Sequence, residues 1–262
     1  MVRKHKLEVI EVTKVFRRGD ETIPALRPTS FSVAPGRFVS IIGPSGCGKS
    51  TLFNIIAGLL APTSGAVLSD GESILGRAGY VGYMLQKDML LPWRTILDNV
   101  ILGLEIRHVP KKTAAAKAMP LIKRYGLAGF ERHYPHELSG GMRQRAALLR
   151  TLLYDRDILL LDEPFGALDA QTRLDMQNWL LKIWQDVRKT VLFVTHDIDE
   201  AIYLSDDVFV FSQRPGYVKA CLPVTLPRPR SQQTMTSPEF MKLKRQLMEM
   251  LSAEQQKGGS EA

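Results

Sequence analysis

The sequence predicts an α/β protein in which helices flank a mainly parallel sheet. Three short runs, at residues 38–42, 158–161 and 191–194, are almost wholly apolar and predict buried strands. Each run leads into a segment with helical signals, and strands therefore alternate with helices along the chain. A length of 262 residues allows one large domain or two small ones.

The composition is that of an ordinary globular protein, with 45% hydrophobic residues and a formal net charge of +8. Cys47 and Cys221 form no metal-binding spacing, and two thiols far apart indicate a reducing, cytosolic compartment. No run reaches the roughly 18 apolar residues of a membrane span. The positive charge fits nucleic acid, anionic lipid or an anionic ligand, and does not choose among them.

The first part of the chain predicts strands of two kinds. Residues 7–13 and 31–33 have the composition of half-exposed antiparallel strands, whereas residues 38–42 run directly into a glycine-rich segment. A helix over residues 50–57 and strands over residues 66–69 and 80–85 should follow.

Residues 87–150 change in character and predict a helical subdomain inserted into the core. Residues 111–125 are rich in Ala and Lys, and Pro120 should kink or restart their helix. The basic residues of this region are scattered, which favours a solvated face over a nucleic-acid stripe; they are Lys111, Lys112, Lys117, Lys123, Arg124, Arg143, Arg145 and Arg150.

After residue 157 the alternation resumes. An amphipathic helix carries Met176, Leu180, Ile183 and Val187, and Asp197 with Glu200 resembles a capping box that opens the next helix. A hairpin is expected over residues 208–224, a linker over 226–237, and a helix from Pro238. One apolar stripe marks that last helix: Phe240, Leu243, Leu247 and Met250. Residues 255–262 have nothing to bury and are expected to be disordered.

The strongest motif is a phosphate-binding loop between the strand at 38–42 and the following helix. Its glycines let backbone N–H groups surround phosphates, Lys49 is expected at the β and γ phosphates, and Ser50 at Mg²⁺. The loop consists of Gly43, Pro44, Ser45, Gly46, Cys47, Gly48, Lys49, Ser50 and Thr51.

Two acids follow the buried run at 158–161. In a parallel sheet that strand end is where ligands bind. Asp162 is expected to hold Mg²⁺, and Glu163 to polarise the attacking water. Alone the pair is an ordinary strand end, but beside a phosphate loop it indicates a nucleoside triphosphatase.

A second anion site is predicted where a helix begins after Ser139, with Gly140 and Gly141 in its first turn. Without its neighbours this segment would be read as a simple serine N-cap.

These motifs, together with Gln86, Asp169 and His196 in that order, resemble the ATP-binding cassette family, the ATPase subunits of ABC transporters. The resemblance covers about residues 7–224. Residues 90–94, 98–100, 164–169 and 195–201 are similar to the nitrate, sulfonate and taurine branch of importer ATPases. The resemblance implies a P-loop NTPase fold with a RecA-like core, an N-terminal antiparallel β subdomain and the inserted helical subdomain.

The resemblance also implies a homodimer, in which the phosphate loop of one copy faces Ser139, Gly140, Gly141 and Met142 of the other across two ATP molecules. Gln86 would reach Mg²⁺ and the attacking water, Glu163 would be the general base, and His196 would contact the γ-phosphate. Asp169 would couple the two sites, and Phe16 would stack on adenine. Met142 replaces the Gln of many relatives, and activity should survive because Ser139 and backbone amides make the contacts.

By the same resemblance, the chain is a peripheral subunit on the cytoplasmic face of a membrane. It would act with integral permease subunits and, indirectly, with a periplasmic or extracellular solute-binding protein, and without nucleic acid. The expected divisions are 1–86 and 151–225 for the two parts of the nucleotide-binding core, 87–150 for the helical subdomain and 226–262 for the linker, helix and tail. A soluble ABC ATPase acting on nucleic acid or ribosomes is the alternative function; a nucleotide kinase would leave Ser139 and His196 unexplained.

Overall fold

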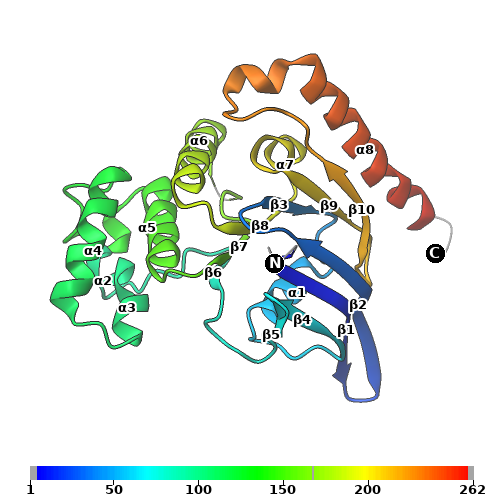
Figure 1. The fold of residues 1–262 in the computed structure, drawn as a ribbon, viewed down its shortest axis with the longest axis horizontal. Coiled ribbons are helices and arrows are strands. Elements are labelled where there is room, and N and C mark those ends of the chain that lie inside the picture. The colour runs from blue at the N-terminus through cyan, green and yellow to red at the C-terminus, as the bar shows by residue number, and fades with distance from the viewer. Residues whose placement is uncertain (1–4, 167, 259–262) are drawn as a thin grey trace. The chain divides into compact units, whose positions relative to one another are not determined.

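The structure, a computed structural model, describes residues 5–166 and 168–258. The chain divides into two compact units (Figure 1). The first consists of the residues up to Tyr80 and those from Arg188 onward, and the second of Val81–Val187. The second unit thus contains the expected helical segment 87–150 and extends beyond it on both sides. The domain limits expected from the sequence remain a prediction.

An antiparallel sheet forms the N-terminal part of the first unit, in the order β2-β1-β4-β5. Its strands are β1 (Leu7–Arg18), β2 (Glu21–Val33), β4 (Ser64–Ser69) and β5 (Glu72–Ser73). Both predicted antiparallel strands are present and extend further than their sequence pattern indicated. The alternation in β1 is incomplete because its register shifts between Val9 and Val12, where Glu11 has a φ of 47°.

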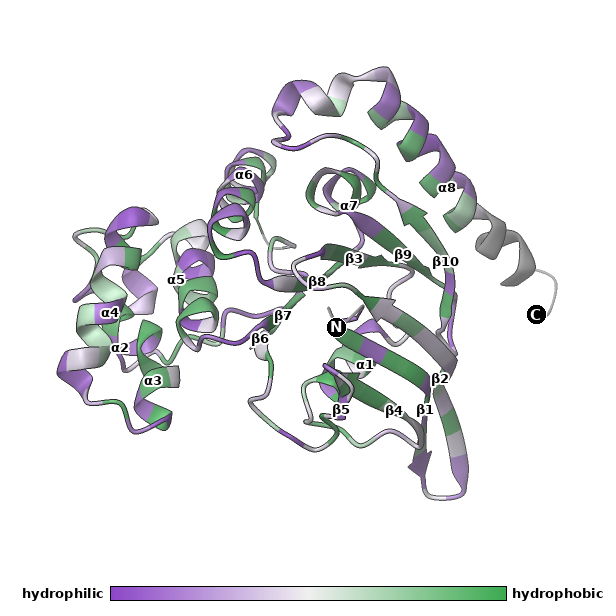
Figure 2. Ribbon diagram, in the orientation of Figure 1, coloured by the Kyte–Doolittle hydropathy of each residue, from purple (hydrophilic) through white to green (hydrophobic). Residues whose placement is uncertain are grey.

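A second sheet in the first unit is mainly parallel, in the order β10-β9-β3-β8. Its strands are β3 (Phe38–Ile42), β8 (Thr190–Thr195), β9 (Asp207–Phe211) and β10 (Val218–Pro223). β3 pairs in parallel with β8 and β9, and β9 and β10 form the predicted antiparallel hairpin. Every residue of β3 and β8 is buried, and these strands are among the most hydrophobic elements (Figure 2).

The helices of the first unit are α1 (Lys49–Ile56), α7 (Ile198–Leu204) and α8 (Pro238–Gly258), with a short 3₁₀ turn at Gln232–Thr236. Asp197 caps α7 by accepting a hydrogen bond from the backbone N–H of Glu200 at 3.1 Å, as the sequence predicts. In α8, Phe240, Leu243 and Leu247 are buried as predicted. The helix is traced to Gly258, and residues 259–262 lie outside the described residues; the disorder expected over residues 255–262 remains a prediction.

The second unit contains two parallel strands and most of the helices. β6 (Gly82–Met84) pairs with β7 (Ile158–Asp162). Its helices are α2 (Ile96–Val100), α3 (Leu102–Ile106), α4 (Lys111–Arg124), α5 (Gly140–Leu153) and α6 (Ala170–Val187), with a 3₁₀ turn at Pro135–Glu137. In α6 the predicted apolar stripe buries Met176, Leu180 and Ile183, whereas Val187 is exposed.

Pro120 does not restart the helix as expected, because α4 runs through it without interruption. Proline removes one backbone N–H, whose acceptor in a regular helix would be the carbonyl of Ala116. Both residues lie on the exposed side of α4, where water can hydrate that carbonyl. Pro120 therefore weakens α4 locally without ending it.

Within the described residues, none of the helices combines the length and the apolar composition that crossing a membrane requires.

Candidate functional site

The phosphate-loop residues connect β3 to α1 through backbone conformations that favour glycine. Gly48, the N-cap of α1, has a φ of 108°, and Gly46 has a φ of 74°. A Cβ at Gly48 would lie 2.8 Å from the carbonyl oxygen of Ala25, which is closer than real contacts allow. At Gly46 nothing lies within 4 Å of such an atom. The loop therefore needs a glycine at position 48 for both space and conformation, and at position 46 for conformation alone.

Lys49 is the charged centre of the loop. Its side chain is buried, with 5% of the residue exposed, and its Nζ donates hydrogen bonds to the carbonyl oxygens of Gly43 and Pro44, each at 2.8 Å. A buried ammonium group requires such partners, because an unpaired buried charge is strongly destabilising. The loop thus holds a cation at its centre, where an anion bound by the backbone amides would be neutralised.

The other loop side chains differ in exposure. Ser45 and Ser50 are exposed, whereas Cys47 is buried with its Sγ 3.7 Å from Lys49 Nζ. Burial raises the pKa of the Cys47 thiol above its usual value, so the group is neutral at pH 7. The exposed hydroxyl of Ser50 in the first turn of α1 leaves an oxygen donor at the position predicted for Mg²⁺.

In the second unit, the predicted acids lie at the end of β7. Asp162 is its last residue and is 4% exposed. The hydroxyl of Tyr83, on the paired strand β6, donates to the carboxylate of Asp162 at 3.4 Å. Burial, together with the negative charge of Asp162, raises the pKa of Tyr83 well above its usual value. Sequence reasoning missed Tyr83; its place three residues before Gln86, on the strand leading to it, was the available signal.

Glu163 and Gln86, which are both expected at the attacking water, contact each other. Gln86 Nε2 donates a hydrogen bond to Glu163 Oε2 at 3.2 Å. Glu163 has a φ of 44°, a conformation that costs a non-glycine residue about 1–3 kcal/mol and is typical of functional sites. The backbone turns sharply there and places the glutamate carboxylate beside the amide of Gln86.

Two arginines of α5 fix the segment that follows Gln86. Arg150 donates to the carbonyl oxygens of Asp88 and Met89 at 2.6 and 2.7 Å, and Arg143 Nε lies 3.3 Å from the Asp88 carboxylate. The third, Arg145, places its guanidinium over the ring of Trp179, 5.7 Å from the centroid. The solvated face expected for the basic residues holds only in part. The three arginines of α5 are half-buried and each makes a contact within the unit, whereas the other five residues are exposed: Lys111, Lys112, Lys117, Lys123 and Arg124.

The helix predicted after Ser139 is α5. Ser139 is its exposed N-cap, and its Oγ accepts a hydrogen bond from the backbone N–H of Met142 at 3.3 Å. A Cβ at Gly141 would lie 2.8 Å from the Cγ2 of Thr172, so this glycine also allows α5 and α6 to pack closely. Gly140 and Met142 are partly exposed in the same turn.

Asp169 precedes α6 and accepts a hydrogen bond from the backbone N–H of Thr172 at 3.0 Å. That bond is the main reason why the pKa of Asp169 is lowered. The carboxylate is exposed and remains ionised at neutral pH. Ala167, two residues earlier, lies outside the described residues.

His196 and Phe16 belong to the first unit and are both exposed. His196 lies between the end of β8 and the N-cap of α7. Phe16 lies on β1 with 39% of the residue exposed, and Lys14 Nζ lies 5.2 Å from its ring centroid. The ring of Phe16 therefore lies at the surface of the first unit.

The predicted site residues are thus divided between the units. The first unit holds Phe16, the phosphate loop and His196; the second holds Gln86, Asp162, Glu163, Asp169 and the N-terminal turn of α5. The part of the chain that the structure describes contains no cluster of three or more His, Cys, Asp or Glu side chains able to hold a metal ion. The donor set expected for Mg²⁺ consists of a serine hydroxyl, an amide and one carboxylate, which are the oxygen ligands that this ion prefers beside phosphates.

Comparison with known proteins identifies the family of the chain. Residues 26–166 match the ABC transporter family. The chain is 48% identical over 251 residues to an uncharacterised ABC transporter ATP-binding protein of Methanocaldococcus jannaschii, covering 96% of this chain and 93% of that protein. It is 42% identical to the aliphatic sulfonates import ATP-binding protein SsuB of Bacillus cereus, over 91% of this chain and 92% of that protein. It is 46% identical to the taurine import ATP-binding protein TauB of Yersinia pestis, over 74% and 76%.

Solved structures show the same fold. A bacterial ABC transporter cassette solved as a dimer superposes with a TM-score of 0.74 at 33% identity, covering 84% of this chain and all of that one. The same cassette in a dimeric post-hydrolysis state bound to ADP and phosphate has a TM-score of 0.74 at 32% identity, with the same coverage.

The two loop glycines provide a matched test of the site. Gly48→Ala is expected to abolish detectable nucleotide binding, because the added methyl would displace the loop from Ala25. Gly46→Ala is expected to lower the free energy of unfolding by only about 1–2 kcal/mol, the conformational cost of a positive φ, and to retain binding. Titration with a fluorescent ATP analogue and urea unfolding of both variants measure this. Equal binding by the two variants would contradict the steric explanation.

Proposed function

Because the chain belongs to the ABC transporter family and is an ATP hydrolase, we propose that it is the subunit that energises an importer for a small solute. Two observations carry this proposal: a phosphate loop centred on Lys49 in the first unit, and an acid, Glu163, that is held beside Gln86 at a strand end in the second. The first feature binds a triphosphate, and the second can activate water.

ATP binding falls to the phosphate loop. Its backbone N–H groups and the N-terminus of α1 face the phosphates, and Lys49 exchanges its two carbonyl partners for phosphate oxygens. Phe16 stacks on the adenine. Ser50, Gln86 and Asp162 would hold Mg²⁺, which would supply positive charge beside the phosphates. Most of the catalysis comes from positioning and charge stabilisation.

Glu163 orients the attacking water and accepts its proton. The hydrogen bond from Gln86 holds the Glu163 carboxylate at the end of β7. His196 contacts the γ-phosphate. The Tyr83 hydroxyl bond to Asp162 orients that carboxylate from the side of the sheet. In this scheme Glu163 acts on the water, Gln86 holds Glu163, and Asp162 belongs to the Mg²⁺ site.

Glu163→Gln is the direct test of the hydrolytic role. The substitution keeps the size of the side chain and removes its basicity, so kcat should fall by about 100-fold or more while ATP binding persists. Steady-state ATPase measurements and nucleotide titration report the two quantities. Wild-type turnover in this variant would defeat the assignment of the base.

Two copies of the chain are proposed to share each ATP. The exposed N-terminal turn of α5, with Ser139 as its cap, offers amides and a hydroxyl to an anion, in addition to those of the phosphate loop. A head-to-tail dimer gives this second site a purpose, because it completes the partner's site. Asp169 then couples the two sites.

Mixing inactive variants tests the shared site. In a random mixture of Lys49→Ala and Ser139→Ala chains, about a quarter of all sites combine an intact loop with an intact Ser139, because half of the dimers are mixed and each has one such site. ATPase activity should therefore return on mixing. If each site lay within one chain, the mixture would stay as inactive as its components.

A membrane permease is proposed to dock beside Gln86. Trp93 is 72% exposed and Met89 55% exposed, and Leu85 is exposed as well. Arg150 fixes the main chain at Met89, so these apolar side chains are displayed on a held segment. Exposed tryptophan and methionine on a rigid support are typical of interface anchors.

The relatives' names favour a sulfonate- or taurine-like solute. The solute would contact the permease and a solute-binding protein outside the membrane, while this chain stays on the cytoplasmic face as a peripheral subunit. The alternative, a soluble ATPase on nucleic acid or ribosomes, loses support because the arginines of α5 contact Asp88, Met89 and Trp179. Stimulation of the ATPase activity by RNA or DNA in the absence of a permease would support this alternative function.

Two methionines of equal exposure test the docking site. Met89 and Met241 are 55% and 52% exposed, and Met241 lies on α8. Met89→Ser, and more strongly Trp93→Ala, should weaken retention of the co-expressed permease by about tenfold or more, while Met241→Ser leaves it unchanged. Affinity purification from detergent-solubilised membranes measures retention. Equal loss in the Met89 and Met241 variants would place the docking surface elsewhere.

A further inference from the structure

Helix α7 connects the loop of His196 to the C-terminal segment of the chain. His196 lies between Thr195 and Asp197. The backbone N–H of Asp197 donates to the Thr195 hydroxyl at 3.0 Å, and that hydroxyl donates to the carboxylate of Glu200. Because both neighbours of His196 are bonded into the first turn of α7, the position of His196 follows the position of this helix.

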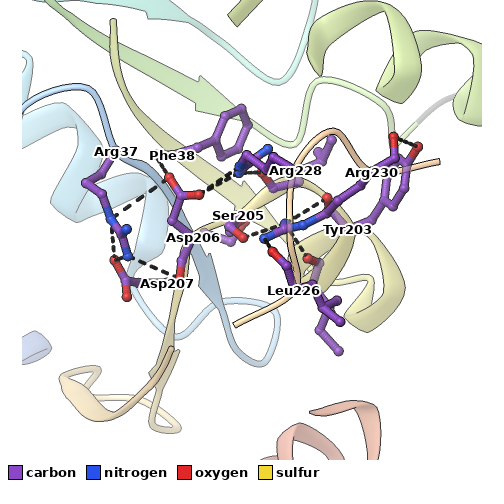
Figure 3. A network of polar contacts seen from close by, with 12 residues as sticks. Arg37, Phe38, Tyr203, Ser205, Asp206, Asp207, Leu226, Arg228 and Arg230 are labelled. Atoms are coloured by element: carbon purple, nitrogen blue, oxygen red, sulfur yellow. Dashed lines mark hydrogen bonds and ion pairs between the residues drawn. The ribbon is translucent and has the colours of Figure 1, made fainter. Parts of the chain in front are cut away.

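The C-terminal end of α7 is held by arginines from the segment expected to be a linker (Figure 3). Arg230 is 7% exposed, and its guanidinium donates to the carbonyl oxygens of Ile202, Tyr203 and Ser205 at 3.0, 3.0 and 2.6 Å. Arg228 donates to the carbonyl oxygen of Leu204 at 2.6 Å. These are the carbonyls that a helix leaves without internal partners at its end.

The charge of Arg230 is preserved despite its burial. Burial is the main cause that lowers its pKa, to about 10, with the nearby Arg228 contributing in the same direction. At neutral pH the guanidinium therefore remains cationic, and a cation is favourable at the C-terminal end of a helix dipole. Leu226 adds a fourth carbonyl partner at 3.2 Å, which ties the segment itself to the arginine.

The other end of α7 is held by α8. Lys244 Nζ lies 2.8 Å from each carboxylate oxygen of Asp199, in the first turn of α7 and three residues after His196. The helix α8 packs against α7 and β9, and its buried residues are Phe240, Leu243 and Leu247 (Figure 1). The C-terminal segment thus contacts α7 at both ends, through Arg230 at one and Lys244 at the other.

We propose that this segment, residues 228–247, positions His196 for ATP hydrolysis, with Arg230 and Lys244 as positioning residues. The proposal rests on the role given to His196 in the proposed function. Two fixed points prevent α7 from pivoting, whereas a single point would not. Loss of the Lys244 bond frees the first turn of α7 while Arg230 and the apolar contacts keep the helix in place, so hydrolysis suffers and the fold persists.

Lysines two residues apart on α8 give the test. Lys244→Met should lower kcat by about tenfold with the KM for ATP changed less than about twofold, because small displacements of a positioning group act on the transition state. Lys242→Met, at an exposed position of the same helix, should match the wild type. Lys244→Arg should have a kcat close to that of the wild type. Asp199→Asn should lower kcat as Lys244→Met does, again with little change in the KM for ATP.

Comparison with His196→Ala separates this proposal from the function on which it rests. Full turnover in His196→Ala would remove the assumed role of His196. A loss in His196→Ala with normal turnover in both Lys244→Met and Asp199→Asn would overturn the positioning proposal alone. The double variant His196→Ala/Lys244→Met should turn over no more slowly than His196→Ala; if the two losses multiply, Lys244 acts independently of His196 and the proposal fails.

Discussion

The buried ammonium of Lys49 is the constraint on which the first unit depends. A cation in that position must have oxygen partners, and only a loop that bends back over the start of α1 brings the carbonyls of Gly43 and Pro44 to it. That bend requires the positive φ of Gly48, and no residue larger than glycine fits at this position because Ala25 of β2 lies against it. The antiparallel sheet thereby shapes the loop, although it supplies none of the loop's residues.

Local sequence signals predicted the parts of the fold that local physics determines. β3 and β8 were predicted because every residue is buried and their sequences show it, and α7 because Asp197 is a strong N-cap. The resemblance to the ABC family indicated Gln86 and Glu163 as site residues, but it did not predict the hydrogen bond between them. The helix through Pro120 was mispredicted, because whether proline breaks a helix depends on the hydration of one carbonyl, which no sequence pattern reports.

Long-range polar contacts account for most of what the sequence did not predict. Arg230 lies in a stretch whose Pro, Ser and Gln content is typical of a linker, yet it is buried among the carbonyls at the end of α7. Arg150 looked like part of a solvated helix face, and it holds the segment after Gln86. The same contacts explain part of the formal charge of +8: arginines that bond to backbone carbonyls add to the charge without forming a binding surface.

The left-handed backbone of Glu163 shows a conflict between activity and folding. Glycine would adopt a φ of 44° without strain, and the glutamate does so at a conformational cost. Selection for stability alone would replace this residue. In the proposed mechanism the base at this position is a carboxylate beside Gln86, and that role accounts for a residue that makes the native state less favourable. Attempts to make this protein more thermostable should therefore leave that turn alone and seek their gains elsewhere in the chain.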